Sequence, residues 1–469
     1  MNPFLNPIIV VKTLKSYLID PSRTERVTPK QLQHYKDKKF KKIVKYAYNV
    51  PIYHEIYKKA GIHPNDIKSL KDVEKLPFIT KNDLRNNFPD RIIPLNYNKK
   101  KGFVISTGGT SGKSVFLYTD LNTMIESLVP SSREARFFNL NTRNSRFVHI
   151  GNLSPCRIDL VFEEKFYSNI KRFISVDNIL NLDVNQPIID IIKKLDDFKP
   201  DVIITYPNIH QNLAFLKRKG YGKNIQPKLL TVGGSMIDDY VRRYVEDAFG
   251  CRLLNIYPSV EAGTNIAFEC SKGTWHIHSD YFYVEVIDEH NNLVPYGKRG
   301  HIVITRLYGQ GTPIVRYTGM EDWIRFFPVK ECACGLTTPV IESFEGRMGA
   351  NIVLSNGKFF PSGAFCFVEP VLNKFKTFKV KQYQIIQKEI DKIDIFLVID
   401  EDLRHVGTPV EKIAEEIKHV YQEKVGPTVT ITVKEVDEIK NTKDAGKPPP
   451  IVVSYVKIQE GFDLINSSL

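Results

Sequence analysis

The middle of the chain alternates short apolar runs with longer segments of helical periodicity. Residues 147–150, 202–206, 229–232 and 252–256 are strand-like, whereas 188–195, 208–218 and 237–248 have the spacing of amphipathic helices. Repeated strand–helix–strand units are typical of a mostly parallel sheet with helices on its faces. Ligands bind such sheets at the carboxyl ends of the strands, where Gly233, Gly234 and residues 257–261 lie.

Shorter β-like runs follow at 283–287, 300–305 and 323–326, and they predict a small barrel or sheet. Beyond Gly346, strand-like runs at 352–354, 395–399 and 428–433 surround a helix at 409–424. We therefore predict an α/β protein with its domain boundary near 346–350. Residues 1–345 form a large N-terminal domain of mostly parallel sheets flanked by helices, plus a small β subdomain. Residues 346–469 form a small α+β C-terminal domain.

The N-terminal segment is helical and basic. Apolar residues Phe40, Ile43, Val44 and Ala47 form one stripe, with lysines on the other side. Residues 1–102 carry 22 Lys and Arg against 9 Asp and Glu, so they hold the whole net charge of +13. Such a segment suits nucleic acid, an anionic membrane, an acidic carrier protein, or simply a solvated helical surface. No nucleic-acid motif accompanies it, and we predict no nucleic-acid partner.

Composition adds few constraints. The 469 residues are 42% hydrophobic and 25% charged, which is ordinary for a globular protein of two or three domains. No apolar run approaches the ~20 residues of a membrane span, and residues 1–11 do not form a secretory signal. We expect a cytoplasmic protein without stable membrane insertion, a monomer or homodimer, with its six cysteines reduced.

A loop of small residues lies between the strand-like runs 103–105 and 115–118. Its members are Thr107, Gly108, Gly109, Thr110, Ser111, Gly112 and Lys113. Glycines permit close backbone approach, and hydroxyls, free N–H groups and a lysine suit a polyphosphate. A P-loop is excluded because Thr107 replaces its first glycine and a strand follows in place of a helix. The alternative is a hairpin turn without a ligand.

Several motifs in order resemble the adenylate-forming (acyl-CoA synthetase-like) superfamily, and most closely its phenylacetate–CoA ligase and CapK-like branch. They lie at 49–53, 76–85, 106–114, 257–261, 313–322, 346–347 and 446–447. The resemblance implies a two-step reaction. A small carboxylic acid attacks the α-phosphate of ATP, giving an acyl-adenylate and pyrophosphate, and a nucleophile, most often CoA, then displaces AMP. It also implies Mg²⁺ and a mobile C-terminal domain.

The resemblance assigns roles to individual residues. Lys447, Glu261 and Lys113 are the catalytic candidates: Lys447 between the carboxylate and the α-phosphate, Glu261 on Mg²⁺, and Lys113 on the β- and γ-phosphates with Thr107, Thr110 and Ser111. Tyr257 would stack on adenine, Asp322 would bind the ribose hydroxyls, and Arg347 would reach a phosphate or ribose oxygen. Gly233, Gly234 and Ser259 complete the nucleotide site. Each role has a structural alternative: Glu261 could be a surface glutamate, Tyr257 a core tyrosine and Lys447 a solvated lysine. The acid pocket should lie near 233–235 and 257–263, with Tyr206 and His149 beside it.

Three positions depart from the family pattern. An extra residue after Arg316 leaves Glu321 or Asp322 as the ribose ligand, and the downstream match favours Asp322. Gly349 and Ala350 replace the usual acidic pair at the hinge, and residues 355–361 lack the family's Arg-Gly pair. That loop helps form the acceptor tunnel in relatives. An acyl-carrier protein or an amine therefore remains an alternative to CoA, and a non-catalytic scaffold is a third hypothesis.

Cys270, His276, Cys332 and Cys334 form two close pairs. Four such ligands suit tetrahedral zinc, although two unrelated pairs are the alternative. A filled protein ligand set predicts a structural zinc that ties the loop after Glu261 to the loop after Asp322, two edges of the active site.

Overall fold

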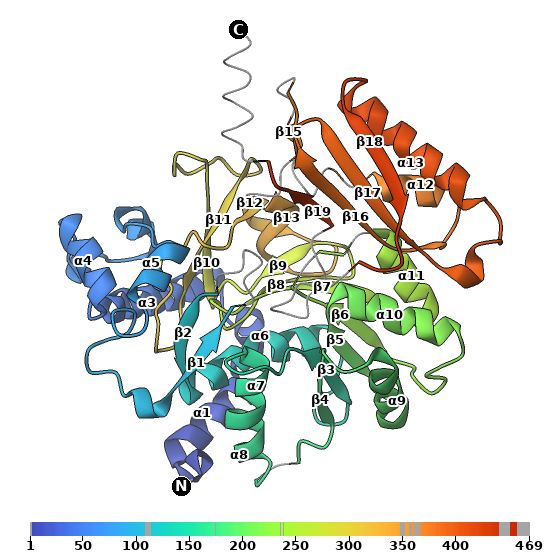
Figure 1. Ribbon diagram of the computed structural model, residues 1–469. Helices are drawn as coiled ribbons and strands as arrows, with labels where there is room; N and C mark the ends of the chain where they lie inside the picture. Colours follow the sequence, from blue (N-terminus) through green and yellow to red (C-terminus); the bar gives the residue numbers. More distant parts are fainter. Residues whose placement is uncertain are drawn as a thin grey trace.

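Strand β7 (Leu253–Ser259) joins two kinds of β-sheet in the computed structural model of the chain (Figure 1). On one side of β7 the strands run parallel, and on the other side they run antiparallel. The parallel strands in sheet order are β4 (Ile179–Asp183), β3 (Phe147–Gly151), β5 (Val202–Thr205) and β6 (Leu229–Val232). The antiparallel strands are β8 (Thr264–Glu269), β9 (Trp275–Ile277), β13 (Thr337–Arg347), β12 (Asp322–Glu331), β11 (Arg299–Arg306) and β10 (Phe282–Ile287).

These eleven strands make one sheet within the described part of the chain. The predicted parallel sheet is confirmed, and the predicted β subdomain is continuous with it through β7, since β7 hydrogen-bonds to both β6 and β8. The structure describes residues 2–107, 114–173, 175–234, 236–237, 239–347, 352–355, 359–360, 365, 367–439 and 451–456.

One face of the parallel sheet is packed tightly against helices. Helices α9 (Ile188–Phe198), α10 (Pro207–Arg218) and α11 (Asp239–Phe249) cover it. The strands contribute Val148, Ile203, Leu230 and Leu253, which are all fully buried. Their alternation with residues of the other face is the two-residue period of a strand.

The opposite face is covered by α6 (Leu121–Phe137), α7 (Ile158–Phe162), α8 (Ser168–Ile170) and α1 (Pro7–Leu18), which lie at the lower left in Figure 1. The sequence prediction omitted α6 and α1. Helix α6 begins at Asp120, whose carboxylate caps it by accepting from the Thr123 backbone N–H at 2.7 Å.

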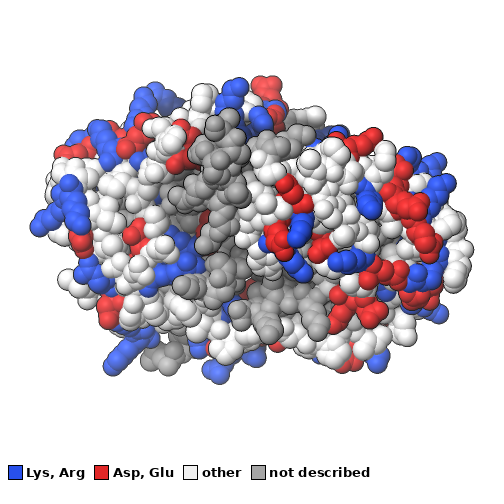
Figure 2. Space-filling model, turned by 45° about the horizontal axis from the view of Figure 1, so that its top comes forward, with Lys and Arg blue, Asp and Glu red and all other residues white. Residues whose placement is uncertain are grey.

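The basic segment forms α3 (Pro29–Ala47), α4 (Pro51–Lys59) and α5 (Lys81–Asn87), preceded by the single turn α2 (Arg23–Arg26). The predicted apolar stripe of α3 is buried, and its lysines 30, 38, 41, 42 and 45 are exposed. Thr80 caps α5 in a capping box with Asp83. Residues 70–75 form a 3₁₀-helix (Leu70–Lys75). Over the face in Figure 2, basic and acidic side chains are interspersed.

The C-terminal part has its own sheet, in the order β18 (Thr430–Glu435), β17 (Lys392–Ile399), β16 (Val380–Glu389) and β19 (Val452–Ser454). Helices α12 (Val368–Lys374) and α13 (Val410–Val425) pack on it, and β14 (Ile352–Val353) pairs with β15 (Phe359–Phe360). It contacts α11, where the Tyr240 hydroxyl donates to the Val380 carbonyl at 2.7 Å. The predicted boundary at 346–350 begins in the last two residues of β13 and ends before β14, and its position stays a prediction.

No helix among the described residues combines the length and the apolar character needed to cross a membrane.

A buried ion network fastens α6 and the N-terminus to the sheet. Arg133 of α6 donates from both terminal nitrogens to Asp280 at 2.9 Å, and Arg23 donates to the same carboxylate at 2.6 Å. Arg133 also donates to the Pro21 carbonyl. Burial alone would raise the pKa of Asp280, but Arg133 and Arg23 lower it to about 2.

We expect Asp280→Ala to lower the free energy of unfolding by about 3–5 kcal/mol at pH 7, because Arg133 is left buried without a carboxylate and Arg23 keeps only its pair with Asp20. The folded-state pKa lies below the unfolded value, so the wild-type advantage should be complete above about pH 4 and shrink as pH falls toward 2. Urea unfolding at pH 7 and pH 3 measures both effects. Glu342→Ala, which breaks the surface pair with Lys330, is the control and should cost under about 1 kcal/mol. Equal losses in the two variants would contradict the assigned role.

Candidate active site

A cavity of about 930 Å³ opens at the carboxyl ends of β5, β6 and β7. It brings together predicted site residues from distant segments: Thr107, Gly233, Gly234, Tyr257, Ser259 and Glu261. His149 and Tyr206 also line it, where the acid pocket was predicted. The location agrees with the rule for open α/β sheets.

Two glycines let the chain pass close to the cavity at the end of β6. A Cβ on Gly233 would lie 2.9 Å from Pro258 Cγ and 3.1 Å from Ile256 Cγ1, so a side chain there would displace the neighbouring strand. Gly234 has φ of +82°, which favours glycine.

The carboxylate of Glu261 is held on both oxygens. Ser259 Oγ donates to Oε2 at 2.7 Å, and the Tyr317 hydroxyl donates to Oε1 at 2.9 Å. Glu261 is buried yet lines the cavity. Burial and the adjacent Glu261 raise the pKa of Tyr317 well above its usual value, so Tyr317 stays a donor at all working pH values.

The loop that carries Glu261 is anchored from β11. Arg306 donates to the carbonyls of Glu261 and Thr312, at 3.1 and 2.7 Å, and the Tyr308 hydroxyl donates to the Ala262 carbonyl at 2.7 Å. These bonds satisfy buried carbonyls and fix the backbone on which the carboxylate stands.

Asp322 and Glu321 have different surroundings. Asp322 is buried at the start of β12 and accepts from the Tyr257 hydroxyl at 2.5 Å. Glu321 has φ of +61°, lines the cavity, and pairs with Lys81 at 2.8 Å. Glu321 lines the cavity and Asp322 does not, so which of the two carboxylates binds the ribose stays a prediction.

Lys81 and Arg85 are site residues that the sequence interpretation left without a role. Both belong to α5 and line the cavity, and Arg85 lies close enough to Tyr317 to lower its pKa. They add two cations beside Glu261 and Glu321. The motif at 76–85 contained both residues, but nothing in the sequence indicated that α5 faces the carboxyl ends of the strands.

Arg316 of the same motif set has a structural role. It makes a bidentate pair with Glu285 at 2.8 and 3.2 Å and donates to the carbonyls of Glu74 and Leu76. These bonds hold the segment before α5 against β10 and so place Lys81 and Arg85.

Some predicted residues lie outside the described part of the chain. They are Gly108, Gly109, Thr110, Ser111, Gly112, Lys113, Gly349, Ala350 and Lys447. The side chain of Arg347 is also outside it, although its backbone pairs with Asp322 in the sheet. The strands flanking residues 108–113 are an antiparallel hairpin, β1 (Gly102–Ser106) and β2 (Phe116–Asp120), which confirms a strand on each side and the exclusion of a P-loop.

The predicted metal cluster is assembled. Ligand atoms of Cys270, His276, Cys332 and Cys334 lie within 4.8 Å of one another, at the turns that end the β8–β9 and β12–β13 hairpins. The cluster is one strand's length away from Glu261 and from Asp322. The prediction that it ties two edges of the active site is therefore wrong: it ties the distal ends of two hairpins.

The chain resembles proteins of known activity along most of its length. It is 26% identical to the phenylacetate–coenzyme A ligase of Pseudomonas putida, over 84% of this chain and 88% of that one. It is 24% identical to the Thermus thermophilus ligase of that name (87% and 94% covered) and 24% identical to the protein CapK of Staphylococcus aureus (85% and 84% covered). Residues 361–452 match the CapK C-terminal domain family.

Solved structures have the same fold. A 2-hydroxyisobutyryl-CoA ligase in the postadenylation state superposes with a TM-score of 0.73 at 18% identity, over 97% of this chain and 94% of that one. The fold, the cavity and these relatives together define an adenylate-forming enzyme of the AMP-forming acid–CoA ligase class. Within that superfamily the chain is similar to the phenylacetate–CoA ligase and CapK-like branch.

We expect Tyr317→Phe and Ser259→Ala each to raise the Mg²⁺ concentration for half-maximal pyrophosphate exchange about 10-fold, because each frees one oxygen of Glu261. Magnesium titrations of the exchange rate measure this. Tyr57→Phe is the matched control, since that buried hydroxyl has no hydrogen-bond partner among the described residues. An unchanged magnesium requirement in both site variants would remove Glu261 from the assigned role.

Proposed function

We propose that the chain activates a carboxylic acid with ATP and transfers the acyl group to CoA. The observation that carries this is the Glu261 carboxylate, buried at the cavity wall with both oxygens held by donors. Fixing a carboxylate in one orientation costs side-chain freedom before any ligand arrives. It is useful where a hard cation and its phosphates must be positioned for reaction.

The nucleotide would occupy the end of the cavity near Gly233. Tyr257 and Asp322 would contact adenosine, and Lys81, Arg85 and Thr107 would face the phosphates. Glu261 offers the hard oxygen ligands that Mg²⁺ prefers, and that ion would neutralise phosphate charge when bound. Lys113, on the β- and γ-phosphates, and Lys447, at the α-phosphate, keep their proposed roles.

In the first step a carboxylate oxygen attacks the α-phosphorus and pyrophosphate leaves. In the second step the CoA thiolate attacks the acyl carbon and AMP leaves, after the thiol proton has passed to solvent. Both steps build negative charge on phosphate oxygens, and fixed cations lower the free energy of that charge. This is the contribution that Lys81 and Arg85 make from α5.

An acyl-carrier protein or an amine is the alternative acceptor. The departure at residues 355–361 motivates it, and a CapK protein is among the relatives. A non-catalytic scaffold is disfavoured by the intact Glu261 clamp. Cytoplasmic location and a monomeric or dimeric state stay predictions.

We expect Lys447→Ala to abolish pyrophosphate exchange while leaving thioester formation from supplied acyl-adenylate largely intact. The reason is that a lysine at the α-phosphate acts in the first step, and closure of the C-terminal part in a second orientation serves the other. Exchange with a panel of acids, followed by product analysis with CoA, carrier protein and amines, makes the measurement. Equal loss of both half-reactions would reject the role of Lys447. If the wild-type protein shows no pyrophosphate exchange with any acid while a control enzyme does, the proposed adenylation function is rejected.

We also propose that the Cys270–His276–Cys332–Cys334 cluster holds one structural zinc ion. Tetrahedral zinc with Zn–S bonds near 2.3 Å separates two sulfurs by about 3.8 Å, and Cys270 Sγ and Cys332 Sγ are 3.8 Å apart. His276 Nδ1 contacts Thr338 Oγ1 at 2.8 Å, which leaves Nε2 toward Cys334 Sγ at 3.2 Å. Burial lowers the pKa of His276 to about 4, so its imidazole is neutral and available as a ligand.

Purified protein should contain about one zinc ion per chain, and Cys332→Ser combined with Cys334→Ser should release it, because two of four ligands are lost. Metal analysis of both proteins makes the test. Cys251→Ser, at a free cysteine elsewhere in the described chain, should keep its zinc. Zinc-free wild type, or full retention in the double variant, would overturn the assignment.

A further inference from the structure

The cavity continues far beyond the nucleotide end, along one whole face of the parallel sheet. Alternate residues of each strand line most of it, and Ile150, Thr205, Asn255 and Tyr257 also border it toward the carboxyl ends of the strands. The alternate residues are Phe147 and His149 on β3, Val202, Ile204 and Tyr206 on and just beyond β5, Leu229, Thr231 and Gly233 on and just beyond β6, and Leu254, Ile256 and Pro258 on β7. The period of two identifies one face of the sheet. It is the face opposite to the one packed by α9, α10 and α11.

This slot, the part of the cavity between the sheet and α6, is long. From Val202 to Tyr206 there are four residue steps, or about 13 Å at 3.3 Å per step. An extended chain advances about 1.2 Å per bond, since one residue of three bonds spans at most 3.6 Å. The slot therefore has room for about ten bonds in a line, whereas a phenyl ring and one methylene occupy less than half of it.

The far end of the slot is apolar and bordered by α1. Ala135, Leu140, Val202, Leu229 and Leu254 form a small buried cluster there, separate from the two larger cores of the described residues. Leu14, Tyr17 and Leu18 of α1 line the same end, and the Tyr17 hydroxyl contacts Thr142 just before β3. A tail that reached this end would bury apolar surface against aliphatic side chains.

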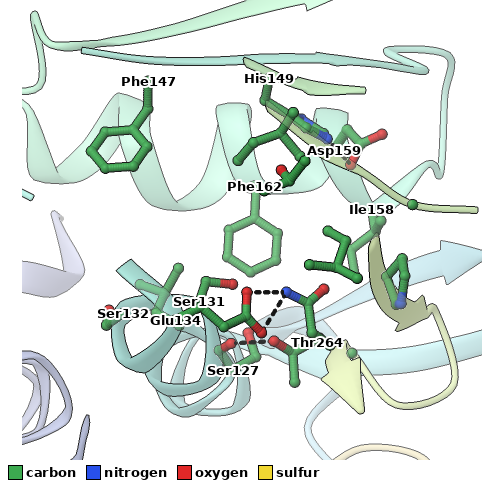
Figure 3. Close-up of a pocket in the computed structure, with 18 of the residues that line it drawn as sticks. Ser127, Ser131, Ser132, Glu134, Phe147, His149, Ile158, Asp159, Phe162 and Thr264 are labelled. Atoms are coloured by element: carbon green, nitrogen blue, oxygen red, sulfur yellow. Dashed lines mark hydrogen bonds and ion pairs between the residues drawn. The ribbon is translucent and has the colours of Figure 1, made fainter. Parts of the chain in front are cut away.

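The Glu134 carboxylate in the middle of the slot is already paired. The Glu134 carboxylate accepts from Asn265 at 2.8 and 3.0 Å and contacts His278 Nε2 at 2.9 Å. Figure 3 shows Glu134, Ser131 and Ser132 on the side of α6, facing Phe147 and His149 on the sheet, with Phe162 between them. A satisfied carboxylate places no demand for a cation on the substrate.

Residues about one helical turn apart on α6 line the slot along its length. Ser127, Ser131 and Ala135 are four residues apart, line the cavity, and advance by about 6 Å per step from the Glu261 loop toward the apolar end. Ser131 is exposed although Pro130 and Arg133 beside it are buried, which agrees with a position facing open space in the slot.

We propose that the acid activated by this enzyme is an extended, largely apolar one, with its carboxylate near Gly233 and its tail between α6 and the sheet as far as α1. This rests on the proposed ligase function for the reaction, but it concerns binding and is tested separately from turnover.

The test uses ω-phenylalkanoates from phenylacetate to 8-phenyloctanoate, which share both end groups and differ in length alone. Calorimetry on the full-length protein, with and without AMP, measures their binding. Affinity should rise about threefold per methylene, as buried apolar area grows, up to six to eight chain carbons. Pyrophosphate exchange with the same acids is measured in parallel.

Two variants shorten the slot. Leu18→Trp fills the far end and should weaken 8-phenyloctanoate at least 10-fold while changing phenylacetate less than twofold. Ser131→Phe fills the middle of the slot and should also weaken the binding of 6-phenylhexanoate at least 10-fold. This variant tests the inference if Leu18→Trp does not fold. Ile8→Trp is the matched control, because Ile8 is on the same helix, 74% exposed and away from the cavity lining.

Phenylacetate binding as tightly as the longer acids, or slot variants that weaken all acids equally, would overturn the inference. Length-dependent binding without exchange for any acid would reject the ligase function and leave the substrate slot standing. Pyrophosphate exchange with phenylacetate and with none of the longer acids would support the ligase function and overturn the substrate slot.

Discussion

The polar bonds that fasten α6 to the antiparallel half of the sheet are the constraint on which the rest of the site depends. In most α/β layers a helix packs its apolar side directly on the strands. Here α6 is fastened by polar bonds to the antiparallel half of the sheet: Arg133 to Asp280, Glu134 to Asn265, and Thr264 to the Ser127 carbonyl. These directional bonds set the position of α6, which joins the parallel strands in the cluster of Ala135 with Val202, Leu229 and Leu254, and the slot runs from that cluster to the Glu261 loop.

The parallel sheet therefore has one face that is packed by helices and one face that lines the cavity. The face toward α9, α10 and α11 buries Val148, Ile203 and Leu230 completely, which supplies the hydrophobic stabilisation of this region. The other face is less completely packed because its residues line the proposed ligand cavity, so it contributes less hydrophobic stabilisation. Strand β7 serves both purposes, since it ends the parallel layer and its end leads into the loop with Ser259 and Glu261.

The sequence predicted the elements whose apolar pattern is strong. Strands β3, β5 and β6 and helices α9, α10 and α11 carry continuous or strictly periodic apolar residues, and all were found within a few residues of their ends. Helix α6 was missed because Ser127, Ser131 and Glu134 face a cavity or a polar network in place of a core, so the apolar period is interrupted. Strand β13 was missed because its pairing with β9 and β12 is set by distant segments.

The position of the site was predictable where a motif carries its own residue types, as at Glu261, Tyr257 and Asp322, whose chemical roles stay proposals. The resemblance supplied their roles, and the structure adds the bonds that orient them: Tyr317 and Ser259 on Glu261, and Tyr257 on Asp322. The Cys270–His276–Cys332–Cys334 cluster was also predictable, from ligand type and spacing alone. Its distance from the active site was not, because the lengths of β8 and β12 decide which ends of the hairpins meet.

The position of α5 connects the basic N-terminal segment with the cavity of the proposed active site. Sequence alone left its excess charge open to membrane, carrier protein, nucleic acid or solvent. Lys81 and Arg85 bring two of its charges to the cavity, while the exposed lysines of α3 remain on the surface. Both proposed substrates, ATP and CoA, are polyanions, and a positive field over the entrance to their site raises the rate of encounter at low ionic strength. In the proposed function, the charges of Lys81 and Arg85 would also hold the phosphates of the nucleotide beside Glu261.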